Sequence, residues 1–470
     1  LSVYGPIAGA PNIFNVVNLD KSQKKTPKTG WHEQTQSFFY SLELGWKSQL
    51  FVTTTGRNDW ASQLANSPQK SFFYPSVGVS WLPSSTFNFP EKFNYLKIRA
   101  SWASVANPFP RELTIATHPY DDTISGWDDK SNYPIGQLYP ERTKTWELGF
   151  DARFLHGFTL SASWYRADTY NQTFNPNLSA SSGYSDIYIQ TGHVRNTGVE
   201  ASLGYDHQWK NWNWNSQFTF SWNKNKIIEL CKEWYNPITE ETITMNRLQI
   251  SKLGRAKFIL KEGGSMGDLY STTDLRRDDK GNIEIDEGGN VVVEDNLPDM
   301  KLGSVFPDYN LAWRNSVSWK NLNLGFLVTA RIGGIVNSLT QANMDLFGVS
   351  EATAAARDAG GALVNGRSLV NPETWYTAIA SQGGIPQYYT YSATNVRLQE
   401  LSLGYTIPRK WLHNVCSITV SFVGRNLWMM YCKAPFDPEA VASTNNFYQG
   451  MDYFMMPSTR NLGFNINIKF

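Results

Sequence analysis

The residues best suited to bind a ligand are aromatic side chains in the long segments between the regular parts of the chain. Carboxylates and amides that can hydrogen-bond hydroxyl groups accompany them. The candidate set is Trp127, Asp128, Asp129, Trp234, Tyr235, Tyr388, Tyr389, Asn445, Asn446, Tyr448 and Tyr453. Aromatic faces stack on the C–H faces of sugars, while amides and carboxylates bond the hydroxyls. The same aromatics can also pack loops together or against a protein partner. The set therefore predicts either a substrate surface or a protein interface.

No motif for catalysis or metal binding is readable. The histidines are scattered, and no Ser–His–Asp or paired-carboxylate arrangement is present. The segment 278–282 lacks the regular spacing and the distal Glu of a calcium loop. We therefore expect a protein that is not an enzyme and that carries no catalytic residue, metal or cofactor.

The three cysteines, Cys231, Cys416 and Cys432, match no zinc spacing. Cys231 and Cys432 both fall in or near long connections, so whether they pair is left open. Cys416 should not bond to Cys432, because sixteen residues of strand would hold them roughly 50 Å apart.

Composition bounds the function classes. The chain has 470 residues with a formal net charge of +1. It therefore lacks the strongly positive net charge that is typical of a nucleic-acid-binding protein. No apolar run is long enough for a membrane helix, which needs about 18 residues. The first residues show no signal peptide, so we expect that it was removed or that this sequence begins within a longer protein.

Residues 212–223 (W-N-W-N-S-Q-F-T-F-S-W-N) set the pattern for the elements that must position these loops. Aromatic and small side chains occupy the even positions, and amides and hydroxyls occupy the odd positions. A strand over a soluble core can look similar, but Trp212 and Trp222 cap both ends, and Trp prefers the lipid–water interface. A strand of this length covers roughly 33 Å, or about 25 Å of height when tilted by about 40°. The segment therefore predicts a strand that spans a membrane.

Similar period-two segments recur along the chain. They cover residues 38–46, 50–52, 77–81, 96–102, 146–154, 158–164, 199–205, 212–222, 311–319, 322–332, 396–405, 418–422 and 462–470. In 396–405 the apolar residues move from even positions (396 and 398) to odd positions (401, 403 and 405). A bulge at Gln399–Glu400 would let all of them face the same side of the sheet. The pattern predicts 13 strands.

The connections between these segments alternate in length. Short ones lie at 47–48, 155–157, 210–211, 320–321 and 408–414, with a medium one containing Pro83 and Pro90; long ones cover 106–144, 171–196, 227–306, 337–394 and 428–460, with a moderate one at 59–73. Such sorting is typical of a transmembrane barrel, and a soluble propeller or sandwich has no reason for it. The turns at 210–211 and 320–321 lie at the same end of the sheet. The chain must therefore leave that end and return to it, so segment 227–306 must hold zero or two spanning strands and never one. Residues 255–270 could supply part of a pair, whereas 282–294 predicts a soluble hairpin turning at 287–290.

These observations predict an all-β fold: a transmembrane antiparallel β-barrel to which residues 1–470 contribute 13 or 15 strands. An odd number places the two termini on opposite sides, so we expect this sequence to be the C-terminal part of one larger barrel with long extracellular loops. A plug domain and the first barrel strands are expected outside it.

The ordered set of motifs resembles the SusC/RagA family of TonB-dependent outer-membrane transporters of Bacteroidetes. The stretches that carry the resemblance are 74–81 (YPSVGVSW), 96–107 (LKIRASWASVAN), 140–151 (PERTKTWELGFD), 192–203 (GHVRNTGVEASL), 396–408 (VRLQELSLGYTIP), 424–427 with Asp437-Pro438-Glu439, and the closing strand 460–470.

The resemblance implies a 22-stranded barrel with an internal plug, energised through the TonB complex. It also implies a SusD-like surface lipoprotein as lid, a dimer of such transporter–lipoprotein pairs, and contact with outer-membrane lipid. The loops would be extracellular and the C-terminus periplasmic. Phe470 resembles the C-terminal aromatic that the barrel-assembly machinery recognises. It can equally be one of the aromatic side chains that ring a barrel at the membrane–water boundary.

The expected function is active import of oligosaccharides across the outer membrane. Oligopeptide import by the same architecture is an alternative. A soluble carbohydrate-binding β module and a passive porin are alternatives from other classes.

Overall fold

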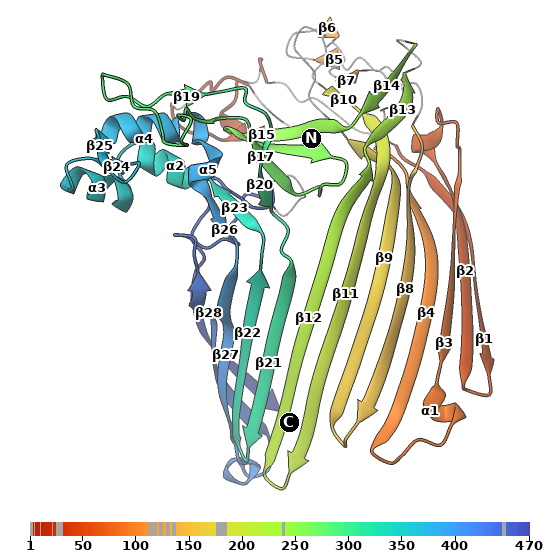
Figure 1. Cartoon of the computed structure of the whole chain (residues 1–470). Helices are drawn as coiled ribbons and strands as arrows, with labels where there is room; N and C mark the ends of the chain where they lie inside the picture. The colour runs from red at the N-terminus through yellow and green to blue at the C-terminus, as the bar shows by residue number, and fades with distance from the viewer. Residues whose placement is uncertain are drawn as a thin grey trace.

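The computed structural model describes residues 3, 5–9, 11–20, 22–24, 32–110, 113, 120–121, 126–127, 132–133, 138–174, 186–236, 240–443 and 448–470. Its main element is a sheet of 13 antiparallel strands that lie side by side (Figure 1). The strands are β1 (Thr35–Trp46), β2 (Leu50–Ala61), β3 (Phe72–Trp81), β4 (Phe93–Asn107), β8 (Glu141–Phe154), β9 (Phe158–Phe174), β11 (Ile189–Trp209), β12 (Trp212–Glu229), β21 (Tyr309–Trp319), β22 (Leu322–Ile332), β27 (Asn395–Ile407), β28 (Ser417–Cys432) and β30 (Asn461–Lys469).

Alternation of side chains gives this sheet one apolar and one polar face. On the apolar face, Phe218 lies opposite Leu203 on one neighbouring strand and Trp313 on the other. On the polar face, the Gln217 amide donates to Ser202 Oγ at 3.1 Å. Cross-strand pairs of like character are what hold neighbouring strands in register. The two-faced pattern predicted for residues 212–223 is therefore confirmed.

The ends of the sheet differ as the connection lengths predicted. Short turns join the strands at one end, and the long connections gather at the other, with the N-terminus there and the C-terminus at the short-turn end (Figure 1). In the first turn, Lys47 and Ser48 take left-handed backbone conformations with φ of 50° and 55°. One medium turn contains the helix α1 (Pro83–Thr86), and the turn before β28 contains the 3-10 helix η5 (Arg409–Leu412).

The predicted bulge is present in β27. Leu398 pairs with Val328 and Glu400 with Leu327, so Gln399 has no partner on β22. The register to β28 shifts at the same place. One extra residue lets the apolar side chains before and after it face the same side. The bulge thus reconciles the phase slip in the sequence with a single apolar face.

The connection between β12 and β21 holds no strand of the main sheet among the described residues, so the strand total is 13 and the spanning pair considered at 255–270 is absent. It folds instead into small sheets: β13 (Cys231–Asn236) with β14 (Glu241–Met245); β15 (Arg247–Leu253), β16 (Ala256–Lys261), β17 (Asp268–Ser271) and β20 (Met300–Ser304); and β18 (Asp274–Leu275) with β19 (Val293–Glu294). The predicted soluble hairpin is confirmed, because Ile285 bridges Val291 around the turn.

The connection between β22 and β27 forms a helical module that projects at the long-loop end (Figure 1). It contains β23 (Ile335–Ser338), α2 (Leu339–Leu346), α3 (Glu351–Asp358), β24 (Ala362–Val364), β25 (Ser368–Val370), α4 (Pro372–Ala380), η4 (Ser381–Gly383), α5 (Pro386–Tyr389) and β26 (Thr390–Ser392). Ser338 and Ser350 cap α2 and α3 through their side chains. Among the described helices, none combines the length and the apolar character needed to cross a membrane.

The remaining described short elements lie in the other connections, except for η1, which precedes β1. They are η1 (Val16–Asn18), η2 (Ser62–Leu64), β5 (Tyr120–Asp121), β6 (Gly126–Trp127), β7 (Asn132–Tyr133), β10 (Asp186–Ile187) and β29 (Met451–Asp452). β29 pairs in parallel with β23 and so ties the last long connection to the helical module.

Candidate functional site

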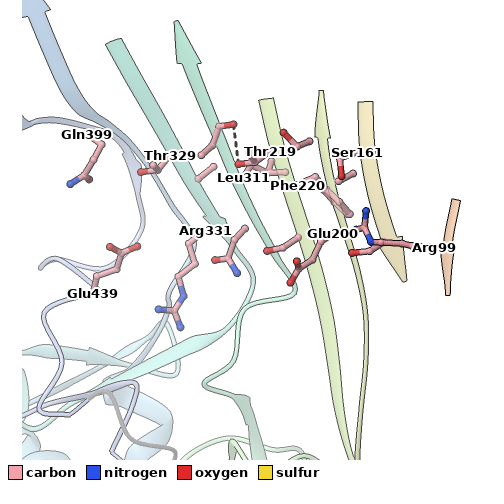
Figure 2. A pocket seen from close by; sticks show the side chains of 17 residues that line it. Arg99, Ser161, Glu200, Thr219, Phe220, Leu311, Thr329, Arg331, Gln399 and Glu439 are labelled. Carbon is pink, nitrogen blue, oxygen red and sulfur yellow. Dashed lines mark hydrogen bonds between the residues drawn. The ribbon is translucent and has the colours of Figure 1, made fainter. Parts of the chain in front are cut away.

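The polar face of the main sheet carries an open hollow of about 670 Å³. Its lining is rich in hydroxyl and amide side chains contributed by successive strands (Figure 2). The polar members are Arg99, Ser161, Ser163, Glu200, Ser202, Thr219, Ser221, Asn310, Thr329, Arg331, Gln399 and Glu439. Such a wall offers many neutral hydrogen-bond donors and acceptors and only a few charges. It can therefore bind polar, hydroxylated or amide-bearing molecules without selecting strongly for charge.

One side of the hollow carries an ion-paired arginine. Arg99 Nη1 on β4 lies 2.8 Å from Asp151 Oδ2, and its Nε lies 3.6 Å from Glu147 Oε1. Ser161 donates a further hydrogen bond to Asp151 at 2.7 Å. Glu200 lies in the same cross-strand row as Arg99, with Gly149 and Ser163 between them, and both line the hollow. These contacts orient the guanidinium and leave the Glu200 carboxylate as a second charged group in the hollow.

The opposite side of the hollow is built around the bulge in β27. Gln399, the residue without a partner on β22, lines the hollow together with Arg331 and Glu439 (Figure 2). Arg331 Nη2 donates to the Val305 carbonyl at 2.9 Å. This bond ties the end of β22 to the four-stranded sheet of β15, β16, β17 and β20, which we call the loop sheet. The bulge therefore serves the site as well as the register, because it adds an amide to the wall.

A buried ion pair anchors Glu439 beside this wall. Arg397 binds Asp437 through Nη1 and Nη2 at 3.1 and 2.8 Å, and Arg397 Nη2 also lies 3.3 Å from Glu439 Oε2. Burial alone would raise the pKa of Asp437, but hydrogen bonds from Arg397 and from the Glu439 N–H hold that pKa below its usual range. The segment Asp437-Pro438-Glu439, noted in the sequence only as part of a resemblance, thus fixes the long last connection to β27.

The loop sheet is held by another ion-paired carboxylate, Asp299. Asp299 accepts from Arg247 Nη2 at 2.8 Å and lies 2.9 Å from Lys261 Nζ. The hydrogen bond from Arg247 is the largest of the effects that hold the pKa of Asp299 far below its ordinary value. This pairing links the strand β15 to the segment before β20.

The structure corrects the expectation for Tyr389. Its side chain is 1% exposed and lies in an apolar core with Ile379, Ile385 and Ala342. Its hydroxyl donates to Asp345 Oδ2 at 2.9 Å, and burial is the main reason that its pKa is raised. Tyr389 is therefore a core residue of the helical module and not a surface aromatic.

Four other predicted aromatics have described side chains. Tyr388 is half-buried against Trp375 at a ring-centroid distance of 5.9 Å, and Tyr448 packs against the core below the loop sheet. Tyr235 and Tyr453 are exposed, and Tyr453 packs edge-on against Phe454. The predicted aromatics whose side chains are described therefore do not form one cluster.

The other predicted residues are less fully described. Trp127 lies in β6 and Trp234 in β13, with only their backbones described. Asp128, Asp129, Asn445 and Asn446 lie outside the described residues. Phe470 follows β30 at the short-turn end and is 91% exposed.

Cys231 and Cys432 do not form a disulfide, and neither does Cys416. Among the described residues, no group of three or more His, Cys, Asp or Glu side chains is arranged to hold a metal ion.

The lining of the hollow was not singled out from the sequence. The signal was present in the polar phase of each strand, for example Thr219 and Ser221 between the aromatic positions. The alternation shows which side chains face inward, but only strand order and register show which of them share a hollow.

Comparisons with known proteins agree with this architecture. The sequence model of the family described as "TonB dependent receptor-like, beta-barrel" matches residues 3–427. TonB-dependent receptor P3 of Formosa agariphila is 26% identical in an alignment of 511 residues that covers 99% of this chain and 49% of the relative. TonB-dependent receptor SusC of Bacteroides thetaiotaomicron is 21% identical in an alignment of 404 residues that covers 80% of this chain and 38% of the relative.

Solved structures show the same fold. The RagAB peptide importer in its closed-closed state superposes with a TM-score of 0.74 at 18% identity, covering 98% of this chain and 50% of the matched chain. The open-open state of the same importer also gives a TM-score of 0.74, at 17% identity. This chain spans about half the length of the relatives and structures that it matches most fully.

Proposed function

The chain belongs to the family of TonB dependent receptor-like β-barrels, and from that premise we propose that the full-length protein actively imports oligosaccharides across an outer membrane. The observation that carries the proposal is the polar hollow on the concave face of a sheet whose other face is apolar. An apolar outer face suits lipid, and a hydroxyl- and amide-lined inner face suits a hydrated solute that passes along it. Sugars offer many hydroxyls and little charge, so this lining suits them better than a strongly basic or acidic lining would.

The partners follow from the same proposal. The long-loop end would be extracellular, and a SusD-like lipoprotein would cover it; the helical module and the exposed residues Phe347, Tyr453 and Phe454 offer apolar contact area there. The C-terminus would be periplasmic. Energy would come from the TonB complex through a plug segment, and two transporter–lipoprotein pairs would form a dimer.

Oligopeptide import is the second candidate. It is favoured by the charged groups in the hollow, because Arg99 and Glu200 on one side and Arg331 and Glu439 on the other could pair with peptide termini or charged side chains. A carbohydrate-binding module free in solution does not fit membership of this family. A passive porin would share the barrel but would not need TonB.

Growth assays distinguish these candidates. A strain lacking the full-length gene would be grown on a panel of single oligosaccharides and defined peptides, with complementation by the wild-type gene in cells with and without TonB. The proposal expects loss of growth on at least one oligosaccharide, restored by the gene only when TonB is present. Restoration on peptides alone would select the second candidate, and restoration without TonB would select a porin.

A further inference from the structure

A band of charged side chains crosses four neighbouring strands on the apolar face of the sheet, immediately beyond its last apolar row. The last apolar row is Leu148, Trp164, Val199 and Trp222, paired across β8, β9, β11 and β12. The next row toward the long loops is Trp146, Arg166, Thr197 and Lys224, and the row after that is Lys144, Asp168, Arg195 and Lys226. A third row begins with Arg142 and continues with Tyr170 and His193. We call Arg142, Lys144, Arg166, Arg195, Lys224 and Lys226 the rim cluster.

The rim cluster faces outward. Each member lies two, four or six residues from an apolar outward residue of its own strand, as Arg166 does from Trp164 and Lys224 from Trp222. The inward positions of the same strands are taken by residues of the hollow such as Ser163 and Glu200, and no member of the cluster lines that hollow. The cluster therefore continues the surface that meets lipid.

Asp168 organises the centre of the cluster. Its carboxylate accepts from Arg166 Nε at 2.8 Å and from Arg195 Nε at 2.7 Å, and it also contacts His193. Its side chain is only 9% exposed, whereas those of Arg166 and Arg195 remain 41% and 29% exposed. Both guanidinium groups are thus held in place through Nε, which leaves their terminal N–H groups able to bind another anion.

Among the described residues of these outward rows, positive charge exceeds negative charge. The rows carry six Lys and Arg residues and two acidic residues, Asp168 and Glu229, of which Glu229 pairs with His193. Within the described part of the chain, no carboxylate is in salt-bridge contact with Arg142, Lys144, Lys224 or Lys226; Arg142 instead donates to Ser104 Oγ at 3.2 Å and the Phe73 carbonyl at 3.3 Å. The excess is local, because the matching outward positions on β4 are Ser104 and Ala106, which pair with Lys144 and Arg142.

The height of the cluster sets the kind of anion that it can meet. Ten residue steps separate Phe158, at the short-turn end of β9, from Asp168. Ten steps of a tilted strand cover roughly 25 Å of height, about one lipid-facing band. The rim cluster therefore lies at the upper boundary of the membrane, at the level of lipid headgroups. Aromatic rings suited to this boundary accompany it, including Trp146 and Tyr170, over which Lys144 Nζ lies at 5.4 Å.

We propose that the rim cluster is a binding site for the phosphate groups of outer-leaflet lipid. Guanidinium and ammonium groups bind phosphate strongly where several converge near a membrane surface. The proposal rests on the proposed placement in an outer membrane, and it concerns lipid that stays bound to the wall, not the transported solute.

The test uses the full-length protein with the triple variant Lys144→Gln/Lys224→Gln/Lys226→Gln, which leaves the Asp168 pairs intact. The matched control removes three lysines from short turns at the other end, Lys47→Gln/Lys210→Gln/Lys320→Gln. Each detergent-purified protein is stripped of lipid and titrated, by native mass spectrometry, with phosphorylated lipid from the host outer membrane, with the same lipid after phosphatase treatment, and with inorganic phosphate.

We expect the rim variant to bind the phosphorylated lipid at least tenfold more weakly than wild type, with the turn variant unchanged and the phosphatase-treated lipid weakly bound throughout. Equal binding by the rim and turn variants would overturn the proposal, as would equal binding of lipid with and without phosphate. Inorganic phosphate bound as tightly as the lipid would overturn the assignment to lipid.

Two further measurements keep the result interpretable. If the rim variant does not assemble, Lys144→Arg/Lys224→Arg/Lys226→Arg must assemble and bind as wild type does, and failure of that charge-preserving variant to bind contradicts the proposal. Cell fractionation tests the membrane placement separately, so an incorrect proposed function is distinguishable from an incorrect lipid site.

Discussion

Phe218 and Thr219 are neighbours in the chain and face opposite surroundings. Phe218 lies between Leu203 and Trp313 on the apolar face, while Thr219 lines the hollow. We expect Phe218→Arg to cost about 2–4 kcal/mol or to block assembly, because it places a charge in the middle of the lipid-facing band. Thr219→Arg should be far milder. Equilibrium unfolding of the full-length protein in lipid vesicles measures both, and equal damage at the two sites would show that the facing is wrong.

Tyr389 supports a different kind of prediction, because its environment is a protein core. Tyr389→Ala should destabilise the helical module by about 3–5 kcal/mol, as truncation of a large buried aromatic does. Tyr453→Ala, at an exposed aromatic, should change stability by less than about 0.5 kcal/mol. Limited proteolysis of the module in the assembled protein compares the two. If Tyr453→Ala exposed the module to cleavage and Tyr389→Ala did not, the assignment of Tyr389 to the core would fail.

At the scale of elements, the bulge in β27 predicts different outcomes for two deletions of one residue each. Removing Gln399 leaves Leu398 and Leu401 in regular alternation, so both keep their outward facing. Removing Ser402 instead turns Leu403 and Tyr405 toward the hollow. We expect the protein lacking Gln399 to assemble and the protein lacking Ser402 not to assemble. Heat-modifiable migration of each full-length variant on denaturing gels reports assembly, and the opposite order would contradict the assigned register.

The loop sheet should show an acid dependence that comes from Asp299. Its pKa is lowered in the folded state, chiefly by the hydrogen bond from Arg247. The stabilisation is therefore fully present above the unfolded pKa, near 3.9, and is lost as the pH falls from there through the lower folded value. The difference in stability between wild type and Asp299→Asn should shrink below about pH 4. Protection of the loop sheet from hydrogen exchange measures it, and a difference that grows in acid would have the wrong sign.

Local alternation was enough to predict the main sheet. It indicated the 13 strands, the sorted connections, the bulge at Gln399 and the hairpin around residues 287–290, because each depends on residues close in sequence. It could not place Tyr389, which contacts Asp345 44 residues away, or reveal that Arg397 holds Asp437 across 40 residues. The helical module and the shared lining of the hollow were missed for the same reason: they depend on packing between distant segments.

At the scale of the whole molecule, the two outer strands of the sheet are the critical feature. In the described structure, β1 pairs only with β2, and β30 pairs only with β28. Exposed strand edges cannot persist in lipid, where no water satisfies their backbone groups. We therefore expect residues 1–470 expressed alone not to form a heat-resistant, detergent-stable barrel, whereas the full-length protein does. A closed, heat-modifiable monomer of residues 1–470 would contradict the proposal that further strands complete the wall.

The central claim is that solute passes along the polar face of this sheet. The most direct test is the initial uptake rate of a labelled cognate oligosaccharide into cells that express the full-length protein with Thr219→Trp, which fills part of the hollow. The matched variant is Phe218→Trp, which adds similar bulk on the lipid-facing side of the same strand. With equal surface expression, we predict severalfold slower uptake for Thr219→Trp and wild-type uptake for Phe218→Trp. Wild-type uptake by both variants, or slower uptake by Phe218→Trp alone, would contradict the account.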